Sequence, residues 1–326
     1  SIILAISSVP TWRRREKLNI DYLGFFISVI FISGFVLGFM EAPNWGWTSL
    51  PIMGLFLLSI ISLITFIGWE KKIPHPLVEL TLFKNLTFTT LFSVLLIIQA
   101  VAIVFVFLAI FLQNVLHYSP LMAGLLLLPA MVPIMLMAPV GGHLRDKYGP
   151  TLPMFCGALL VVLSLIWIAI FSHNRGYAWL FPGLLVYGIG MPLILSGIMA
   201  TVMNMVNAQQ RGMASAIFNC ARQFGNTIGL ALLTGLLASV NKWQLNSFLH
   251  HSPVPLSRLK EQQIDGLLVQ SDQAMKAIAH LSLAHIELLK TAALNAYTNA
   301  FSMTLLAAAI LAFLSLFLIL KIPRKQ

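Results

Sequence analysis

Charged side chains are scarce in this sequence. They make up 9% of its 326 residues, whereas hydrophobic residues make up 59%. Soluble domains carry about 25% charged residues, so this chain has too few to cover a surface that faces water. A membrane crossing needs about 20 apolar residues, and seven long segments lack Asp, Glu, Lys and Arg altogether: residues 22–40, 42–69, 85–144, 148–174, 176–210, 223–241 and 291–320. The composition therefore indicates an integral membrane protein.

The apolar segments lack the alternation of polar and apolar residues that transmembrane barrel strands show. Helices are then the way to satisfy every backbone hydrogen-bonding group inside a bilayer. The sequence therefore predicts an all-α polytopic membrane protein. Its eight expected spans are residues 21–41, 49–69, 88–112, 120–141, 152–171, 178–203, 213–240 and 296–320.

The net charge of +10 does not indicate a nucleic-acid partner, because the basic residues gather in short connections on one side of the predicted membrane. Residues 13–15, Lys71, Lys72 and Arg145 are among them. Short loops that are rich in Lys and Arg stay in the cytoplasm. That side is therefore predicted to be cytoplasmic, and the long segment 241–292 is predicted to be external.

Acids are missing from the interior of every predicted span, since all ten lie in loops or at helix ends. A proton-driven transporter usually needs a carboxylate or a histidine inside the membrane. A proton relay would therefore have to lie in a part of the protein upstream of this chain, with Asp21 or Glu41 assisting at a helix end.

Recognisable catalytic and metal-binding motifs are missing too. The sequence shows no Ser/His/Asp set, no phosphate-binding loop and no metal-ligand spacing. Cys156 and Cys220 fall inside predicted spans, where they are expected to be small buried hydrophobes. We therefore expect no enzyme activity, no catalytic or metal-binding residue, and no cofactor.

Residues 1–10 are apolar, and the arginines at 13–15 follow them. A signal peptide carries its positive charges before the apolar run. We therefore interpret residues 1–10 as the tail of a transmembrane helix that begins upstream, and we expect a preceding N-terminal helical bundle. The expected order is then a basic cytoplasmic loop with two linker helices (11–69), a cytoplasmic amphipathic connector (70–87), a six-helix bundle (88–320) and a cytoplasmic tail (321–326).

A polar stripe crosses the predicted span 213–240. Arg222 follows Arg211 by about 16 Å along a helix, which is close to the middle of a bilayer core about 30 Å thick. An arginine there is costly unless it faces water or a partner. The stripe is therefore predicted to line a substrate pathway, and snorkelling or a structural tie to another helix is the alternative. Gln99, deep in span 88–112, is expected to make either a structural hydrogen bond between helices or a ligand contact. With it, the predicted pathway residues are Gln99, Asn219, Arg222, Gln223 and Asn226.

Small residues mark two further places. Ala221, Gly225 and Gly229 stand beside the stripe at helical spacing and are predicted to let two helices approach closely. The sequence Gly-Ile-Gly-Met-Pro at residues 188–192 is expected to loosen or kink its helix.

Residues 141–150, with the sequence Gly-Gly-His-Leu-Arg-Asp-Lys-Tyr-Gly-Pro, are predicted to form a tight cytoplasmic turn between two spans. Asp146 is expected near the start of the following helix, where the helix dipole favours an anion. Arg145, Lys147 and Arg211 are its candidate partners.

Four motifs follow one another along the chain. They are Pro-Leu-Val-Glu-Leu-Thr-Leu-Phe-Lys-Asn from Pro76, Ser-Pro-Leu-Met-Ala-Gly-Leu-Leu-Leu-Leu-Pro from Ser119, the Gly142-x-Leu-x-Asp-Lys-x-Gly149 turn, and Arg211-Gly-Met-Ala-Ser-Ala-x-x-Asn-x-x-Arg-Gln-x-Gly225. Together they resemble the 14-helix EmrB/QacA-type drug:proton antiporters of the major facilitator superfamily. The resemblance implies that the chain is the C-terminal portion of such a protein, with the end of helix 6, two linker helices and the C-terminal six-helix bundle. It also implies a conformational latch at Gly142, Asp146, Lys147 and Gly149, with Arg211 nearby.

The resemblance implies a secondary active multidrug exporter that works by drug:H⁺ antiport with alternating access, in the cytoplasmic (inner) membrane of a bacterium. Its expected partners are the lipid bilayer, lipophilic drug-like substrates, the N-terminal bundle, and a periplasmic adaptor with an outer-membrane channel. Two alternatives stay open. A lone arginine in mid-membrane also suits an exporter of an anionic metabolite or siderophore, and a non-transporting scaffold or sensor would dock a partner on segment 241–292.

Overall fold

The computed structural model describes residues 21–74, 76–251 and 283–322, and every regular element in these ranges is a helix. Eight helical segments there are long and apolar enough to cross a membrane, which confirms the predicted all-α polytopic fold. In chain order the elements are α2 (Tyr22–Trp45), α3 (Leu50–Glu70), the short 3₁₀ helix η1 (Leu80–Lys84), α4 (Leu86–Ala102), α5 (Val104–Asn114), α6 (Pro120–Leu126), α7 (Leu128–Tyr148), α8 (Thr151–Phe171), η2 (Ser172–Asn174), α9 (Tyr177–Met205), η3 (Ala208–Gln210), α10 (Arg211–His251) and α13 (Leu283–Leu320).

Polar side chains start two of the spans. The carboxylate of Asp21 accepts a hydrogen bond from the backbone N–H of Gly24 at 2.9 Å, at the start of α2. The amide oxygen of Asn85 accepts one from the N–H of Thr87 at 2.9 Å, at the start of α4. The first N–H groups of a helix have no partner within it, so these side chains satisfy donors that the membrane boundary would otherwise leave unpaired.

Two spans are each interrupted once. The helix breaks at Ile103 between α4 and α5, and at Leu127 between α6 and α7. Pro129 explains the second break, because proline has no N–H and its ring crowds the preceding turn. Residues 188–192, which were expected to loosen their helix, do not interrupt α9. Gly188 instead packs against the backbone of Ala130 on α7.

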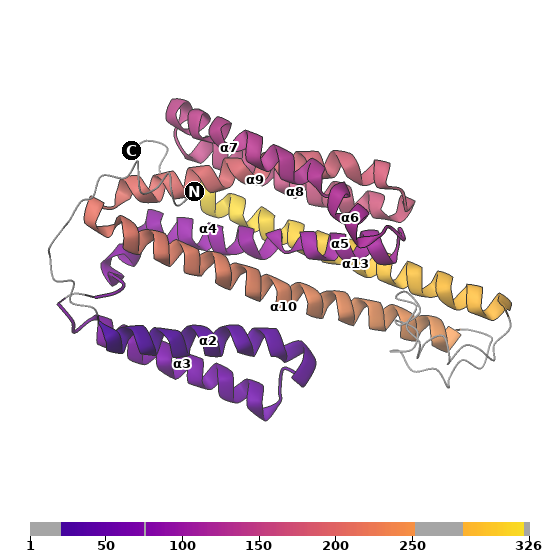
Figure 1. The fold of residues 1–326 in the computed structure, drawn as a ribbon, viewed down its shortest axis with the longest axis horizontal. Coiled ribbons are helices and arrows are strands. Elements are labelled where there is room, and N and C mark those ends of the chain that lie inside the picture. The colour runs from indigo at the N-terminus through magenta and orange to yellow at the C-terminus, as the bar shows by residue number, and fades with distance from the viewer. Residues whose placement is uncertain (1–20, 75, 252–282, 323–326) are drawn as a thin grey trace.

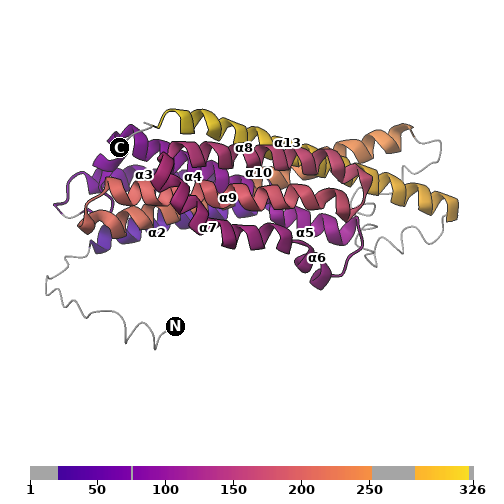
Figure 2. The same ribbon diagram turned by 90° about the horizontal axis from the view of Figure 1, so that it is seen from above.

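Six spans form one bundle, and α2 and α3 form a hairpin at its edge (Figure 1). Within the bundle α9 packs against α7 and α8, while α13 packs against α8, α10 and α4. α10 lies between α4 and α2, so α10 connects the hairpin to the bundle. Figure 2, turned by 90°, shows that the spans run side by side along one common direction. We call α2 and α3 the linker hairpin.

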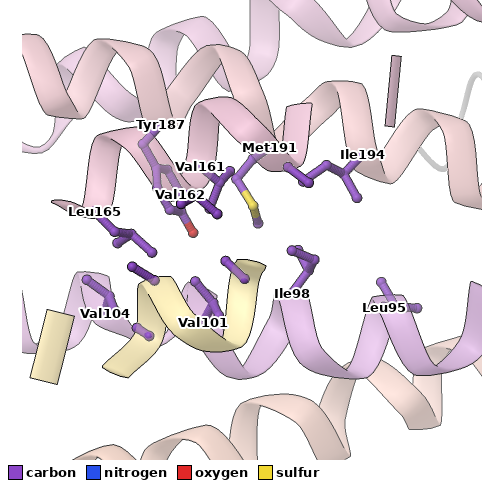
Figure 3. Close-up of a cluster of buried hydrophobic side chains, with 14 of the residues drawn as sticks. Leu95, Ile98, Val101, Val104, Val161, Val162, Leu165, Tyr187, Met191 and Ile194 are labelled. Carbon is purple, nitrogen blue, oxygen red and sulfur yellow. The ribbon is translucent and has the colours of Figure 1, made fainter. Parts of the chain in front are cut away.

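The bundle core lies where α8 and α9 face α4 and α5. Val161, Tyr187 and Met191 point from one side toward Ile98 and Val101 on the other (Figure 3), and each of the five is at most 5% exposed. Lipid is as apolar as these side chains, so burial alone does not drive such an interface. Close shape matching and dispersion contacts hold it instead.

Two glycines bring α10 against the backbone of α4. A Cβ at Gly225 would lie 2.9 Å from the Cβ of Gln99 and nearer still to the carbonyl oxygen of Leu96. A Cβ at Gly229 would lie 2.8 Å from the carbonyl carbon of Ala100 and nearer still to its oxygen. The close approach predicted from the small residues of α10 is therefore confirmed.

The helices α10 and α13 are longer than the spans predicted for them. The 41 residues of α10 correspond to about 60 Å, twice the thickness of a bilayer core of about 30 Å. Both helices thus continue into the segment 241–292 that the sequence predicts to be external, because the structure is helical up to His251 and again from Leu283.

These extensions have a physical cause. The predicted boundaries at residues 240 and 296 stop short of the charged residues Lys242 and Lys290. A charged residue marks the membrane boundary, but it does not stop a helix. Leu245 and Leu289 are 1% and 0% exposed. Asn299 of α13 donates a hydrogen bond from Nδ2 to Oε1 of Gln244 on α10 at 2.9 Å. The middle of the segment 241–292, residues 252–282, falls outside the described residues, as do residues 1–20.

Gly229→Ala should destabilise the bundle, and Gly235→Ala on the same helix is the matched control. The new Cβ at position 229 meets backbone atoms of α4 that cannot rotate away, whereas no atom lies within 4 Å of the corresponding position at 235. Overpacking of this kind costs about 1–3 kcal/mol, and a helical Gly→Ala change in open space gains up to about 1 kcal/mol. Thermal unfolding in detergent, followed by size-exclusion chromatography, measures both variants. Equal midpoints for the two would contradict the close α4–α10 contact.

Candidate functional site

The polar stripe lies on the exposed side of α10. Ala221 is fully buried and Gly225 packs on α4, so the far side of α10 turns away from this contact. Most of the stripe is exposed and its last member is half-buried; its residues are Ser215, Asn219, Arg222, Gln223 and Asn226. Four predicted pathway residues are thereby brought to one helix face.

Gln99, the fifth predicted pathway residue, lies elsewhere. It stands on α4 and is 7% exposed, and it packs beside Gly225 at the α4–α10 contact. It therefore lies behind the stripe rather than on its exposed face. The role of all five residues in a pathway stays a prediction.

Arg222 is the charged residue of the stripe. It lies about 16 Å along the helix from Arg211, the first residue of α10, and its side chain is exposed. Among the described residues no ion pair involves it. A guanidinium at this depth is costly in lipid, so the exposed face of α10 has to meet water or another protein element.

The linker hairpin covers one edge of the stripe. The ring of Phe224 packs against Phe31 and Phe35 of α2, with centroids 5.6 and 5.0 Å apart. Beside this aromatic contact is a hollow of about 290 Å³, lined by Ile32, Val36, Ala216, Asn219, Cys220, Gln223 and Phe224. Two of the predicted pathway residues, Asn219 and Gln223, therefore face α2.

Asp146 lies at a different helix end from the one predicted. It was expected near the start of the following helix, but α7 continues to Tyr148 and α8 starts only at Thr151. Asp146 is therefore in the last turn of α7, where the helix dipole disfavours an anion. Its neighbour Arg145 compensates, because Arg145 Nε donates a hydrogen bond to Asp146 Oδ1 at 2.9 Å.

The other residues of the predicted latch are spread around this turn. Gly149 ends α7 with a φ of 78° and a ψ of 170°, a conformation open almost only to glycine. Gly142 has no atom within 4 Å of its Cβ position. Lys147 and Arg211 are exposed, and in the described chain neither forms an ion pair with Asp146. The tight turn is thus shorter than residues 141–150, and the latch role stays a prediction.

Near the predicted cytoplasmic boundary one acid closes the linker hairpin and a second joins the hairpin to the connector. Trp69 Nε1 donates to Asp21 Oδ2 at 3.1 Å, which closes the end of the α2–α3 pair. Glu70 is 4% exposed, and its Oε2 accepts a hydrogen bond from the N–H of Val78 at 3.3 Å. Asp21, which the sequence predicts to assist a proton relay, caps α2 in the structure and ties it to α3.

Glu79 joins the connector to the bundle. Its carboxylate accepts a hydrogen bond from the side-chain amide of Gln210, and its N–H donates to the sulfur of Met213 at 3.1 Å. Gln210 in turn forms a capping box with Asn207 just before α10. Sequence reasoning missed this link, although an Asn followed three residues later by Gln is a recognisable helix-start signal.

The family model described as Major Facilitator Superfamily matches residues 1–230. The chain belongs to the Major Facilitator Superfamily. This is a family of membrane transporters, in agreement with the expectation that the chain is a multi-pass membrane protein and not an enzyme.

Curated relatives are similar over much of the chain. "Multidrug resistance protein Stp" of Mycobacterium tuberculosis is 30% identical over 259 residues, which are 79% of this chain and 48% of that protein. The "Tetracenomycin C resistance and export protein" of Streptomyces glaucescens is 27% identical over 217 residues, 65% of this chain and 40% of that protein. The chain spans about half the length of the curated relatives it matches.

A solved structure shows the same fold. It is the inward-facing, occupied form of a bacterial homologue of the human lysosomal transporter Spinster, with a TM-score of 0.54. The match covers 90% of this chain and 66% of the other at 15% sequence identity. The superfamily fold predicted from the four motifs is therefore confirmed.

Two variants test the predicted latch motif: Gly149→Ala changes the backbone turn, and Asp146→Asn removes the charge. A Cβ at φ 78° costs about 1–3 kcal/mol, so the glycine variant should unfold at a lower temperature. The Asp146 side chain is 65% exposed and pairs with its chain neighbour, and exposed pairs contribute at most about 1 kcal/mol. Asp146→Asn should therefore keep its unfolding midpoint within a few degrees of the parent in a thermal scan. A large stability loss in Asp146→Asn would contradict the exposed arrangement of this turn.

Proposed function

We propose that the chain is the C-terminal portion of a 14-helix exporter that moves lipophilic drug-like compounds out of the bacterial cytoplasm in exchange for protons. The two linker spans followed by six bundle spans support the 14-helix subtype. The names of the relatives, which include multidrug resistance and export, support the substrate class and the direction. The rest of the transporter would be an N-terminal bundle in the same inner membrane.

The observation that carries the proposal is the exposed polar face of α10. Arg222 and its neighbours stand at membrane depth on a side that the described bundle leaves uncovered. Such polar groups are stable only against water or a partner. A second bundle opposite α10 would enclose a polar central cavity there, and rocking of the two bundles would open it alternately to either side.

Proton coupling would then depend on groups outside this bundle. The acids in or beside the described spans stand at or near helix ends rather than in mid-membrane; they are Asp21, Glu41, Glu70, Asp146 and Glu287. A carboxylate that takes up protons within the cavity would therefore come from the N-terminal bundle. A periplasmic adaptor and an outer-membrane channel would complete export where the cell has an outer membrane.

One observation favours a second candidate, an exporter of an anionic metabolite or siderophore. Arg222 has no acidic partner among the described residues, so an anionic substrate would supply the missing counter-charge. Competition between lipophilic cations and organic anions for the same transport separates the two candidates.

Dye efflux from pump-deficient bacteria tests the proposal. We expect the product of the complete gene to export a lipophilic cationic dye, and a protonophore to abolish this export. The present chain alone should export none, because it would supply half of the cavity. Efflux by this chain alone, or efflux that the protonophore leaves unchanged, would contradict the proposal.

Arg222→Ala should lower transport at least tenfold while leaving the amount of protein in the membrane within about twofold. An exposed side chain contributes little packing, so its removal should act on the cavity rather than on folding. Arg222→Lys, which keeps a positive charge, is the matched control and should retain part of the transport. Parallel loss of transport and abundance in the alanine variant would identify Arg222 as a structural tie.

A further inference from the structure

A second, larger cavity lies between the linker hairpin and the bundle. Its volume is about 500 Å³, within the range of about 300–1,000 Å³ that is typical of small-molecule sites. We call it the linker pocket. Its lining comes from α2, α3, the connector, α4 and α10, and one aromatic residue from each of these segments contributes: Phe31, Phe66, Phe83, Phe92 and Phe224.

The walls of the linker pocket are apolar. No charged side chain lines it, and its polar lining groups are Ser28 and Cys220. The hydroxyl of Ser28 already donates to the carbonyl of Phe25 within α2 at 2.7 Å. The pocket therefore offers aromatic faces and edges with almost no hydrogen-bonding demand, which suits a lipophilic aromatic molecule.

The depth of the pocket points to the cytoplasmic leaflet. It uses the first half of α2 and of α10 and the last part of α3, and these ends carry the basic connections that predict the cytoplasmic side. The connector covers it there, held by Val78 to Glu70 and by Glu79 to Gln210. A molecule dissolved in the cytoplasmic leaflet would meet the pocket from the lipid.

The linker pocket also adjoins the polar stripe. It shares Ile32, Ala216, Cys220 and Phe224 with the hollow that Asn219 and Gln223 line. Phe224 stands at the boundary, packed against α2. A ligand in the pocket thus lies one side chain away from the face of α10 assigned to the central cavity.

We propose that the linker pocket binds one lipophilic aromatic molecule from the cytoplasmic leaflet, as an entry site beside the central cavity. The role as an entry site rests on the proposed export function, whereas the binding itself does not. A lipid acyl chain has similar apolar chemistry, but it would leave the five aromatic rings without a matching partner.

The two cysteines of this chain provide a test. Both are exposed, contrary to the expectation that they are buried; Cys220 lines the pocket, whereas Cys156 lies on α8, away from it. The full chain in lipid vesicles is prepared as Cys156→Ser, which keeps Cys220, and as Cys220→Ser, which keeps Cys156. The alkylation rate with N-ethylmaleimide is measured with and without N-phenyl-1-naphthylamine, a neutral lipophilic aromatic probe.

We expect the probe to slow the alkylation of Cys220 at least fivefold and to leave the rate at Cys156 within about 1.5-fold. Equal slowing at both cysteines would mean that the probe acts through the bulk lipid, and this would overturn the proposal. No slowing at Cys220 would overturn it as well.

A pocket-filling variant gives an independent arm. Ala216→Phe places a ring inside the pocket and should abolish the saturable fluorescence increase of the probe. Leu232→Phe adds the same ring to an exposed α10 position outside the pocket and should leave the increase unchanged. If mass spectrometry instead finds a tightly held phospholipid that is lost only in Ala216→Phe, and the probe does not displace it, the pocket is a lipid site and the proposal is wrong.

The outcome is separable from that of the export experiment. Protection of Cys220 together with absent dye efflux would uphold the binding site and overturn the exporter. Efflux without protection would uphold the exporter and overturn the linker pocket.

Discussion

The contact between α4 and α10 at Gly225 and Gly229 determines much of what this chain presents to its surroundings. With no side chain in between, the two backbones approach so closely that a single Cβ would collide. This contact also determines the rotation of α10 about its own axis. Because one face is committed to α4, Arg222 and the rest of the polar stripe have to point outward, and Phe224 has to meet the linker hairpin.

The same rotation explains why two different surfaces stand side by side on α10. The stripe offers amide groups and a guanidinium, while the adjoining edge, with Ala216, Cys220 and Phe224, helps to form an apolar pocket with the linker hairpin. The proposed export of lipophilic compounds would use both surfaces: an apolar site that competes with the membrane, and a polar path from which the compound is released. In this chain the two surfaces lie on one helix.

The connector forms hydrogen bonds both to the linker hairpin and to the start of α10 in the bundle. Glu70 holds the backbone of Val78, and one residue further Glu79 holds Gln210 at the entrance of α10. Lipid provides no hydrophobic force between helices, so such polar ties at the boundary keep the hairpin in register with the bundle. Any rocking of the bundle has to carry the hairpin along or break these bonds.

The sequence by itself determined the membrane class, the eight spans and the small-residue contact face of α10, because each follows from a local property: the cost of exposing charge or backbone to lipid, and the room that glycine leaves. It also identified the polar residues of α10 by their spacing. Only the tertiary structure decided that Gln99 lies behind the stripe, that Asp146 ends α7 rather than starting α8, and that α10 and α13 continue beyond the predicted boundaries. These features depend on which surfaces pack together, as Leu245 and Leu289 show in the helix extensions. Charge and hydropathy along the chain show where it passes between water and lipid. The partner of each helix face is decided by contacts between residues far apart in the sequence.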